Sequence, residues 1–448
     1  MEKFFKLKKH GTNVQTETMA GLTTFLTMIY ILVVNPSILS DSGMDWGSVF
    51  TATCLSAAIA TLVMGLWGNL PFALAPGMGL NAFLTYTVVL GMGHTWQFAL
   101  AAIFVEGIIF LLLTGFNIRE AIVASIPDNL KKAISVGIGL FIAFIGMQNA
   151  GIIAPNPSTA VELHLIHGAS GSFAPAVAFI GLIITSILVV LKVPASLLIG
   201  IILTTLIGIP FGVTVWNPAG LKFVPPSMAP TFLGCFEGFA EISGSKGVFD
   251  FIIVMFTFLF VDMFDTVGTL VGCALNGNMT IKDKHGNTTV PNCKQALFAD
   301  AIGTTVGSLF GTSTVTTFVE SSSGVVAGGR TGLTAVTTAV LFILSLFLAP
   351  LFSSVPSAAT APILIIVGLY MCSQINTIDF THDYTEAIPA FLTVAFMPLA
   401  YSIADGIMFG ILSYVILKAV KRDWKAISPA TWVLFALFVA KIIVNQIA

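Results

Sequence analysis

Charge is scarce in this sequence of 448 residues, because Asp, Glu, Lys and Arg together make up only 9% of it while 56% is hydrophobic. The mean hydropathy of +0.97 lies far outside the range of soluble globular domains. A Walker A motif is missing, so ATP is not expected to drive the activity. The formal net charge of −2 argues against nucleic acid as a partner. These absences indicate a polytopic membrane protein.

Metal-ligand spacings and paired cysteines are also missing. The five cysteines show no CxxC spacing and fall mostly in apolar runs, so we interpret them as small core residues. His94, His164, His167, His285 and His382 lie in predicted loops or at span ends, where exposed side chains are expected. The sequence therefore predicts no metal site, no cofactor and no catalytic residue.

Apolar runs of about 20 residues, the length needed to cross a bilayer as a helix, recur along the chain. They predict an all-α protein of fourteen spans. A last apolar stretch, Thr431 to Ala448, is either a fifteenth span or an interfacial helix. The predicted spans are 17–39, 48–68, 74–91, 95–114, 133–153, 173–191, 194–212, 249–275, 294–311, 314–330, 332–352, 355–374, 387–402 and 403–420.

Basic residues in the short loops predict the orientation. If the fourteen spans alternate, Arg119, Lys131, Lys132, Lys192 and the later basic clusters all fall on one side. We therefore expect a cytoplasmic N-terminus. The membrane that we expect is a bacterial-type inner membrane.

An internal repeat predicts that the two halves are related. Ala58 to Gly68 reads AIATLVMGLWG and Ala301 to Gly311 reads AIGTTVGSLFG, and a second pair of short matches relates Gly139 to Gly368. Because each half holds seven spans, an odd number, the second half enters the membrane from the opposite side. The expected architecture is two inverted seven-span repeats, which is typical of transporters.

Two carboxylates, Asp262 and Asp265, interrupt the apolar run from Phe249 to Leu275. A charged side chain at mid-membrane costs on the order of 3 kcal/mol even on lenient scales, so such acids indicate a substrate or ion site. A buried acid also binds protons more readily, which favours an ion gradient as the driving force. The plainer interpretation of Asp262 is a packing role.

The third and tenth spans are predicted to be broken helices with short extended pieces. Ala75 to Phe83 reads APGMGLNAF, in which Gly79 and Asn81 follow a proline, and Glu320 lies where a Thr-rich piece of the tenth span gives way to serines. Such interruptions meet at the midplane of inverted-repeat transporters and form the binding site. The plainer roles for Glu320 and Asn81 are helix capping.

Other acids are open to two interpretations. Asp300 either accepts hydrogen bonds from hydroxyls such as that of Thr304 or relays protons. We expect Thr269, like Asp262 and Asp300, to take part in proton coupling or to support the site. Glu106 and Asp405 are expected to be structural.

At APGMGLNAF, VDMFDTVGTL (261–270) and FVESSS (318–323), the chain resembles the AzgA-like adenine, hypoxanthine and guanine permeases of the nucleobase–ascorbate transporter superfamily. The resemblance begins at TETMAGLTTFLTMIYILVVNP in the first span and covers nearly the whole chain. It implies that Asp265 and Glu320 contact a purine. By the same resemblance, Asn81 matches the family's third-span asparagine and Asp262 matches one of its two eighth-span acids. The first span lacks the GlnHis pair of the uracil, xanthine and ascorbate branch, which favours a purine.

The family fold implies a core domain that moves against a gate domain like an elevator, often within a homodimer. The core would comprise 1–125 and 249–353, and the gate 126–248 and 354–448. A planar base could stack on Phe25 or Phe318. We therefore predict a proton-coupled purine importer, embedded in the lipid bilayer, with purine and protons as its ligands. An anion transporter of related fold, a passive channel and an intramembrane enzyme are the alternatives.

Overall fold

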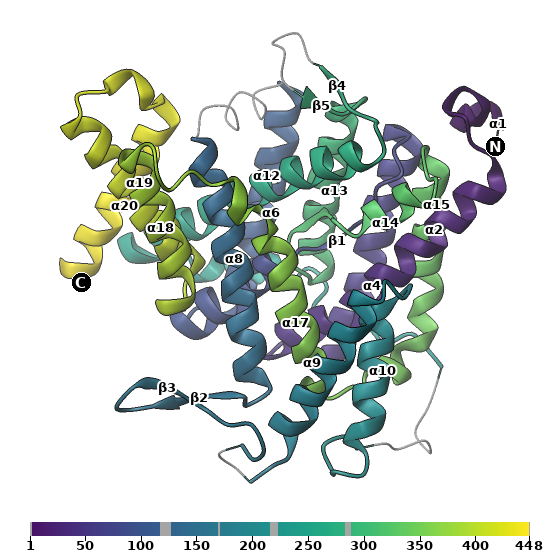
Figure 1. The fold of residues 1–448 in the computed structure, drawn as a ribbon. Helices are drawn as coiled ribbons and strands as arrows, with labels where there is room; N and C mark the ends of the chain where they lie inside the picture. The colour runs from purple at the N-terminus through teal and green to yellow at the C-terminus, as the bar shows by residue number, and fades with distance from the viewer. Residues whose placement is uncertain (1, 117–126, 169–170, 216–222, 283–287, 448) are drawn as a thin grey trace.

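The structure, a computed structural model, describes residues 2–116, 127–168, 171–215, 223–282 and 288–447. Within these ranges the chain is mostly helical, and its strands form three two-stranded sheets. Eight of the described helices are long and apolar enough to cross a membrane, and five apolar helices are shorter. Figure 1 shows the two termini on opposite flanks of the molecule.

The elements of the first half, in chain order, are α1 (Glu2–Phe5), η1 (Leu7–His10), α2 (Val14–Met28), α3 (Ile31–Ser40), α4 (Trp46–Val63), η2 (Met64–Gly68), β1 (Leu74–Pro76), α5 (Met78–Ala82), η3 (Phe83–Gly91), α6 (Trp96–Gly115), α8 (Asp128–Asn149), β2 (Ile153–Asn156), β3 (Ala160–Leu163), α9 (Ala174–Val190) and α10 (Ser196–Gly208). Of these, η2 and η3 are π-helical.

The elements of the second half are α11 (Gly234–Gly238), η5 (Phe239–Glu241), α12 (Gly244–Asn276), β4 (Ile281–Lys282), β5 (Thr288–Thr289), α13 (Cys293–Phe310), β6 (Val315–Thr317), α14 (Ser321–Val326), α15 (Gly332–Ser345), η6 (Leu346–Leu348), α16 (Ala349–Phe352), α17 (Ser357–Cys372), η7 (Ser373–Thr377), α18 (Tyr384–Leu399), α19 (Ile403–Val420), η8 (Trp424–Ala426) and α20 (Pro429–Ile447).

Local chemistry explains where several long helices begin. The side chains of Asn13, Asp45 and Thr95 each accept a hydrogen bond from the backbone N–H three residues later, at 2.9, 2.8 and 3.2 Å respectively. These bonds satisfy N–H groups that have no partner inside the helix. Capping therefore fixes the starts of α2, α4 and α6, and each of these helices begins a helical stretch that is long and apolar enough to cross a membrane.

The short extended pieces predicted in the third and tenth spans are present as β1 and β6. They pair antiparallel with Ala75 opposite Thr316. Each strand is also bonded by a buried threonine from the helix before it. Thr61 accepts from the N–H of Leu74 at 2.9 Å and donates to the Leu74 carbonyl at 3.1 Å. Thr304 makes the same two bonds to Val315 at 3.2 and 3.3 Å. Two interrupted spans thus satisfy their backbone groups inside the protein.

Residues that the sequence repeat relates occupy corresponding places in the structure. Thr61 and Thr304 are related by the repeat offset, since 304 minus 61 is 243, and they make matching bonds. Gly139 on α8 and Gly368 on α17 meet where their helices cross, since a Cβ on either would lie within 2.6 Å of the carbonyl oxygen of the other. The residues matched by the sequence repeat therefore make similar local contacts in the two halves of the chain.

Helix packing separates the helices into two groups. In the first, α13 packs on α4 and α6, α15 packs on α2 and α4, and α12 packs on α6. In the second, α17 packs on α8 and α9, and α18 packs on α8 and α19. The boundary predicted between 125 and 126 lies outside the described residues, as do Arg119 and His285.

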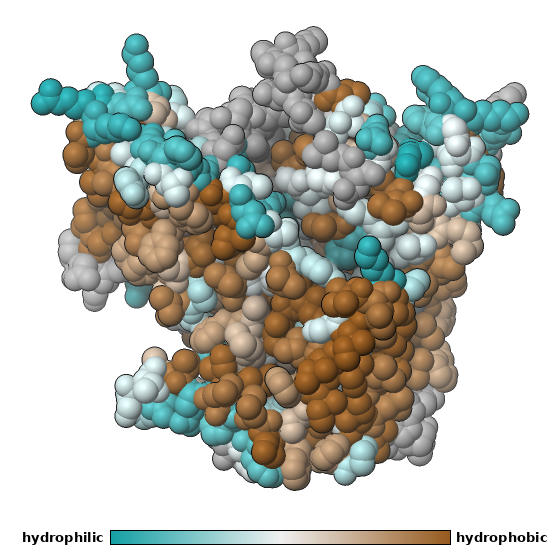
Figure 2. Space-filling model, in the orientation of Figure 1, coloured by the Kyte–Doolittle hydropathy of each residue, from teal (hydrophilic) through white to brown (hydrophobic). Residues whose placement is uncertain are grey.

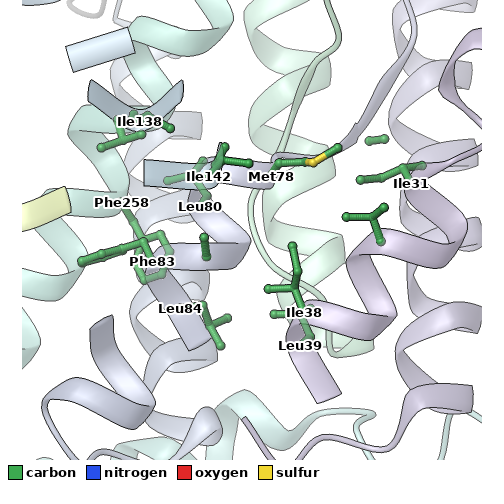
Figure 3. Close-up of a cluster of buried hydrophobic side chains, with 14 of the residues drawn as sticks. Ile31, Ile38, Leu39, Met78, Leu80, Phe83, Leu84, Ile138, Ile142 and Phe258 are labelled. Atoms are coloured by element: carbon green, nitrogen blue, oxygen red, sulfur yellow. The ribbon is translucent and has the colours of Figure 1, made fainter. Parts of the chain in front are cut away.

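A buried apolar cluster joins the two groups, and Figure 3 shows side chains of α5 and η3 between α3 and α8. Phe83 contacts Phe258 of α12 edge to face, with ring centroids 4.8 Å apart. A Cβ on Gly79 would lie 2.5 Å from Cγ2 of Ile138. Glycine at this position therefore lets α5 approach α8 closely.

Exposed apolar side chains cover the outward faces of α9 and α10, among them Ile183, Ile187 and Leu206. Figure 2 shows a broad hydrophobic surface in this region, with hydrophilic groups gathered toward the two ends of the molecule. This distribution fits a protein surrounded by lipid. The C-terminal stretch forms a single helix, α20, that packs on α12 and α19.

Replacing Thr61 by valine is expected to lower the stability of the protein in detergent by about 2 kcal/mol, because two buried backbone groups of Leu74 would lose a partner. Unfolding by SDS titration measures the change. Thr23→Val is the matched control, since the Thr23 hydroxyl bonds only the Met19 carbonyl of its own helix, at 2.9 Å. Equal stability of the two variants would contradict the role of Thr61.

Stability should also depend on Asp383, which caps α18 and contacts the buried Lys418 ammonium at 3.1 Å. Hydrogen bonds from Thr385, followed by those from Lys418, hold the pKa of Asp383 well below its usual value of 3.8. A lowered folded-state pKa gives stability that is complete above the ordinary pKa and is lost as the pH falls below it. Melting temperatures between pH 6 and pH 3 should therefore fall less for Asp383→Asn than for the wild type.

Candidate functional site

A cavity of about 70 Å³ lies where the paired strands meet α12 and α17. Glu320, Asp265, Phe318, Gly79 and Thr269 all line it. The structure therefore brings together five of the residues singled out in the sequence.

Glu320 lies at the junction of β6 and α14. The hydroxyl of Tyr30, which lies between α2 and α3, donates a hydrogen bond of 2.5 Å to Oε1 of Glu320. The Glu320 side chain makes no capping bond to its own helix. Its carboxylate is therefore turned toward the cavity and Tyr30 rather than used to start α14.

Asp265 faces Glu320 from α12, the longest helix in the described part of the chain. Its Oδ2 accepts a hydrogen bond of 3.3 Å from the hydroxyl of Thr316, the central residue of β6. Strand β6 thus positions both carboxylates. Its middle residue bonds Asp265, and Glu320 follows three residues after its last residue.

Asp262 and Asp300 form a separate buried pair behind the cavity. The hydroxyl of Thr266 lies 2.6 Å from Oδ1 of Asp300 and 3.2 Å from Oδ1 of Asp262. All three residues are fully buried. A hydroxyl has one hydrogen, so Thr266 donates to one of the two carboxylates at a time. The arrangement can accommodate a proton shared among these groups.

Asn81 lies near the cavity but is not among its lining residues. It is fully buried, and its Oδ1 accepts a hydrogen bond from the hydroxyl of Ser313, just before β6. Its Nδ2 has no hydrogen-bond partner among the described residues. Asn81 therefore ties α5 to the segment leading into β6 and keeps one donor available.

The two candidate stacking rings are placed differently. Phe318 lines the cavity, and its N–H donates to the Ala73 carbonyl at 3.0 Å. Phe25 instead packs edge to face on Phe342 of α15, with centroids 5.4 Å apart, and is not among the lining residues. Phe318 is thus the ring that a ligand in the cavity would contact.

Sequence reasoning missed Tyr30, Thr316 and Tyr370, which also line the cavity. Tyr370 had one usable signal, since the repeat matches it to Phe141, whereas nothing in the first span distinguishes Tyr30 from its apolar neighbours. The expectation that the histidines are exposed is wrong for His94. Its ring stacks on Phe98 and contacts Glu241 at 2.9 Å and Asp250 at 3.3 Å, which leaves the side chain 14% exposed.

A wider vestibule of about 740 Å³ shares Asp265, Thr269 and Tyr370 with the cavity. Lys131 and Lys132 line the vestibule, so it reaches the end of the molecule at which α8 begins. In the described part of the chain, no three His, Cys, Asp or Glu side chains are grouped so that they could hold a metal ion. The lining of the cavity provides carboxylates, hydroxyls and aromatic rings, which can form hydrogen bonds, exchange protons and stack on a planar ligand.

Comparison with solved structures shows the fold. The transmembrane domain of a cyanobacterium bicarbonate transporter, BicA, aligns with a TM-score of 0.61 at 14% identity, over 90% of this chain and 96% of that one. The murine anion transporter Slc26a9 in its inward-facing state aligns with a TM-score of 0.60 at 11% identity, over 90% of this chain and 68% of that one.

Sequence comparison shows the family. The model of the Permease family matches residues 15–409. The putative permease MJ0326 of Methanocaldococcus jannaschii is 48% identical over 99% of this chain and 98% of its own length. The adenine permease AdeP of Escherichia coli is 43% identical over 99% and 96%. The guanine/hypoxanthine permease PbuG of Bacillus subtilis is 43% identical over 98% of each. This chain is a multi-pass membrane transporter that belongs to the Permease family.

Proposed function

We propose that this protein carries a purine nucleobase across the membrane and binds it between Asp265 and Glu320. The observation that supports this most is that both carboxylates and the ring of Phe318 line one cavity. Ionised carboxylates only accept hydrogen bonds, and a purine presents N–H donors along its edge and a flat face for stacking. Gly79 and Asn81 contribute from the start of α5. The substrates named for AdeP and PbuG favour the same class.

We further propose that protons drive import. Two fully buried carboxylates, Asp262 and Asp300, that both lie within hydrogen-bond distance of the Thr266 hydroxyl support this, because such a pair offers a place to bind a proton inside the protein. Thr269 lines the cavity one turn beyond Asp265 and Thr266, on the side of the vestibule. Binding of a base at Asp265 would then change the surroundings of the buried pair, which couples the two ligands.

The transport motion that we propose is an elevator-like shift of a core domain, 1–125 and 249–353, against a gate domain, 126–248 and 354–448. The two groups of packed helices support this division. The cavity lies between them, since Glu320 and Asp265 come from one group and Tyr370 from the other. The matching bonds of Thr61 and Thr304 and the crossing at Gly139 and Gly368 favour an inverted repeat.

In the proposed orientation the N-terminus is cytoplasmic and the membrane is the inner membrane. The vestibule lined by Lys131 and Lys132 then opens to the cytoplasm, so the structure represents an inward-facing state. We also retain the homodimer as a proposal, to be tested by cross-linking in membranes.

An anion transporter is the second candidate, because BicA and Slc26a9 share the fold. The site argues against it. Two carboxylates line the cavity, and negative charge repels an anion.

Uptake of radiolabelled adenine, hypoxanthine and guanine into cells that lack their own purine permeases tests the proposal. We expect uptake of at least one purine, abolished by a protonophore and unaffected by replacing sodium with choline. Competition with bicarbonate and chloride tests the second candidate and should have no effect. Absence of purine uptake by well-expressed protein would refute the substrate class. Uptake that requires sodium and resists the protonophore would refute proton coupling alone.

A further inference from the structure

A second cavity, of about 180 Å³, lies away from the site described above. Its polar lining includes the carboxylate of Asp41, the amide of Asn149 and the hydroxyl-bearing residues Ser37, Ser357 and Thr360. None of these residues has a role in the proposed function. Asp41, Asn149 and Ser357 are exposed, so the cavity opens at the surface of the molecule at this end.

Both cavities lie along the same two helices. Tyr30 lines the first cavity, while Val34, Ser37 and Asp41 line the second, and these residues recur every three or four positions through α3. Residues spaced in this way share one face of a helix. From Tyr30 to Asp41 the path therefore runs about 16 Å along that face, given a rise of 1.5 Å per residue.

Helix α17 lines both cavities in the same manner. Val367 and Tyr370 line the first, and Leu364, Thr360 and Ser357 line the second, again at helical spacing. The two cavities are thus successive chambers on one seam between α3 and α17. In the proposed arrangement α3 belongs to the core and α17 to the gate, so the seam is the surface along which the domains slide.

A chain of hydrogen bonds holds the second chamber. The Tyr86 hydroxyl, on η3, donates to Oδ2 of Asp41 at 2.8 Å, and the amide of Asn149, the last residue of α8, donates to the same hydroxyl at 2.9 Å. The chain thus joins a core carboxylate to a gate amide. Oδ1 of Asp41 accepts no hydrogen bond from the described residues, so the carboxylate keeps an acceptor.

We propose that this chamber is an outer binding site for the transported heterocycle, where Asp41 accepts its N–H groups, and that Tyr86 occupies Asp41 while the path from this chamber to the inner site is closed. The proposal rests on the proposed function and orientation. A carboxylate and hydroxyls line both cavities, and the second adds the amide of Asn149. Such groups suit a ligand with N–H donors and carbonyl or ring acceptors. The base would pass along the seam from Asp41 to Glu320, both of which belong to the core, before the core moves.

Uptake kinetics of Asp41→Asn in intact cells test the outer site. We expect the external KM for the purine to rise at least fivefold, while the affinity measured from the vestibule side in inside-out vesicles stays within twofold of the wild type. Glu237→Gln is the matched control, because it removes one exposed carboxylate of α11 on the same proposed side. A wild-type external KM for Asp41→Asn would overturn the proposal. Absence of uptake by the wild type would instead overturn the proposed function.

Thiol labelling provides a readout that does not depend on Asp41→Asn being well folded. Thr360→Cys places a thiol in the chamber, and a membrane-impermeant maleimide is applied from outside, with the wild type as background. We expect Tyr86→Phe to increase the labelling rate at least threefold, and the purine that the wild type imports to slow it. Labelling that Tyr86→Phe and the purine both leave unchanged would overturn the proposal.

Discussion

Replacing Glu320 by glutamine is expected to lower purine uptake about 100-fold while the protein remains in the membrane. Glutamine replaces one of the two acceptor oxygens with an NH₂ donor, which repels the N–H donors of a purine, and it also removes the negative charge. Hydrogen bonds to charged groups are worth about 1.5–3 kcal/mol each, and the loss of one or two gives an effect of this size. Initial rates of radiolabelled uptake, divided by the amount of protein in the membrane, measure it.

Glu162→Gln is the control for this prediction, since Glu162 is an exposed carboxylate on the β2–β3 hairpin. Tyr30→Phe separates binding from positioning, because it removes only the 2.5 Å bond to Oε1 and should lower uptake less than Glu320→Gln does. Near-normal kinetics for Glu320→Gln would remove this residue from the site.

Asp265→Asn is expected to weaken purine binding about 30-fold. Asp262→Asn should change purine binding less than threefold, but it should abolish the accumulation of purine against its concentration gradient. The difference follows from their places. Asp265 lines the cavity, while Asp262 lies at Thr266 and Asp300 behind it. Loss of one charged hydrogen bond accounts for the first effect, and loss of a proton-carrying group accounts for the second.

Purine binding to purified protein, measured by isothermal titration, and exchange of labelled for unlabelled purine across vesicles distinguish the two variants. Exchange requires no net proton movement, so Asp262→Asn should retain it while failing to accumulate purine. Equal losses of binding in both variants would show that the two carboxylates act as one site.

The sequence was informative where the physical signal is local. Apolar run lengths located the long helices within a few residues, and α19 coincides with its predicted span, 403–420. Pro76 with its neighbouring glycines, and the threonines of 314–317, located the two interruptions, because these residue types disfavour a continuous helix. The inverted repeat predicts that the two interruptions meet, but their strand pairing and register needed the structure, since no local pattern specifies them.

The cavity was predictable only in part, for a similar reason. Glu320 and Asp265 stand out because acids are rare in apolar spans. Tyr30 and Tyr370 are ordinary residues in their spans, and it is the way α3 and α17 pack that places them beside Glu320. Phe25 and Phe318 are equivalent as letters in a sequence. Their difference arises because Phe318 lines the cavity, whereas Phe25 packs edge to face with Phe342 of α15.

The pairing of β1 with β6 has a consequence for how the protein is made. Ala75 and Thr316 face each other across 241 positions, so the ribosome completes the partner of β1 only after more than half of the chain has emerged. Until then β1 has backbone groups that lipid cannot satisfy, at several kcal/mol for each exposed group. During biosynthesis, the third span must therefore stay shielded from lipid or only partly inserted until β6 has been made. Expressing the first half alone should yield a segment that chaperones or proteases recognise as unfinished.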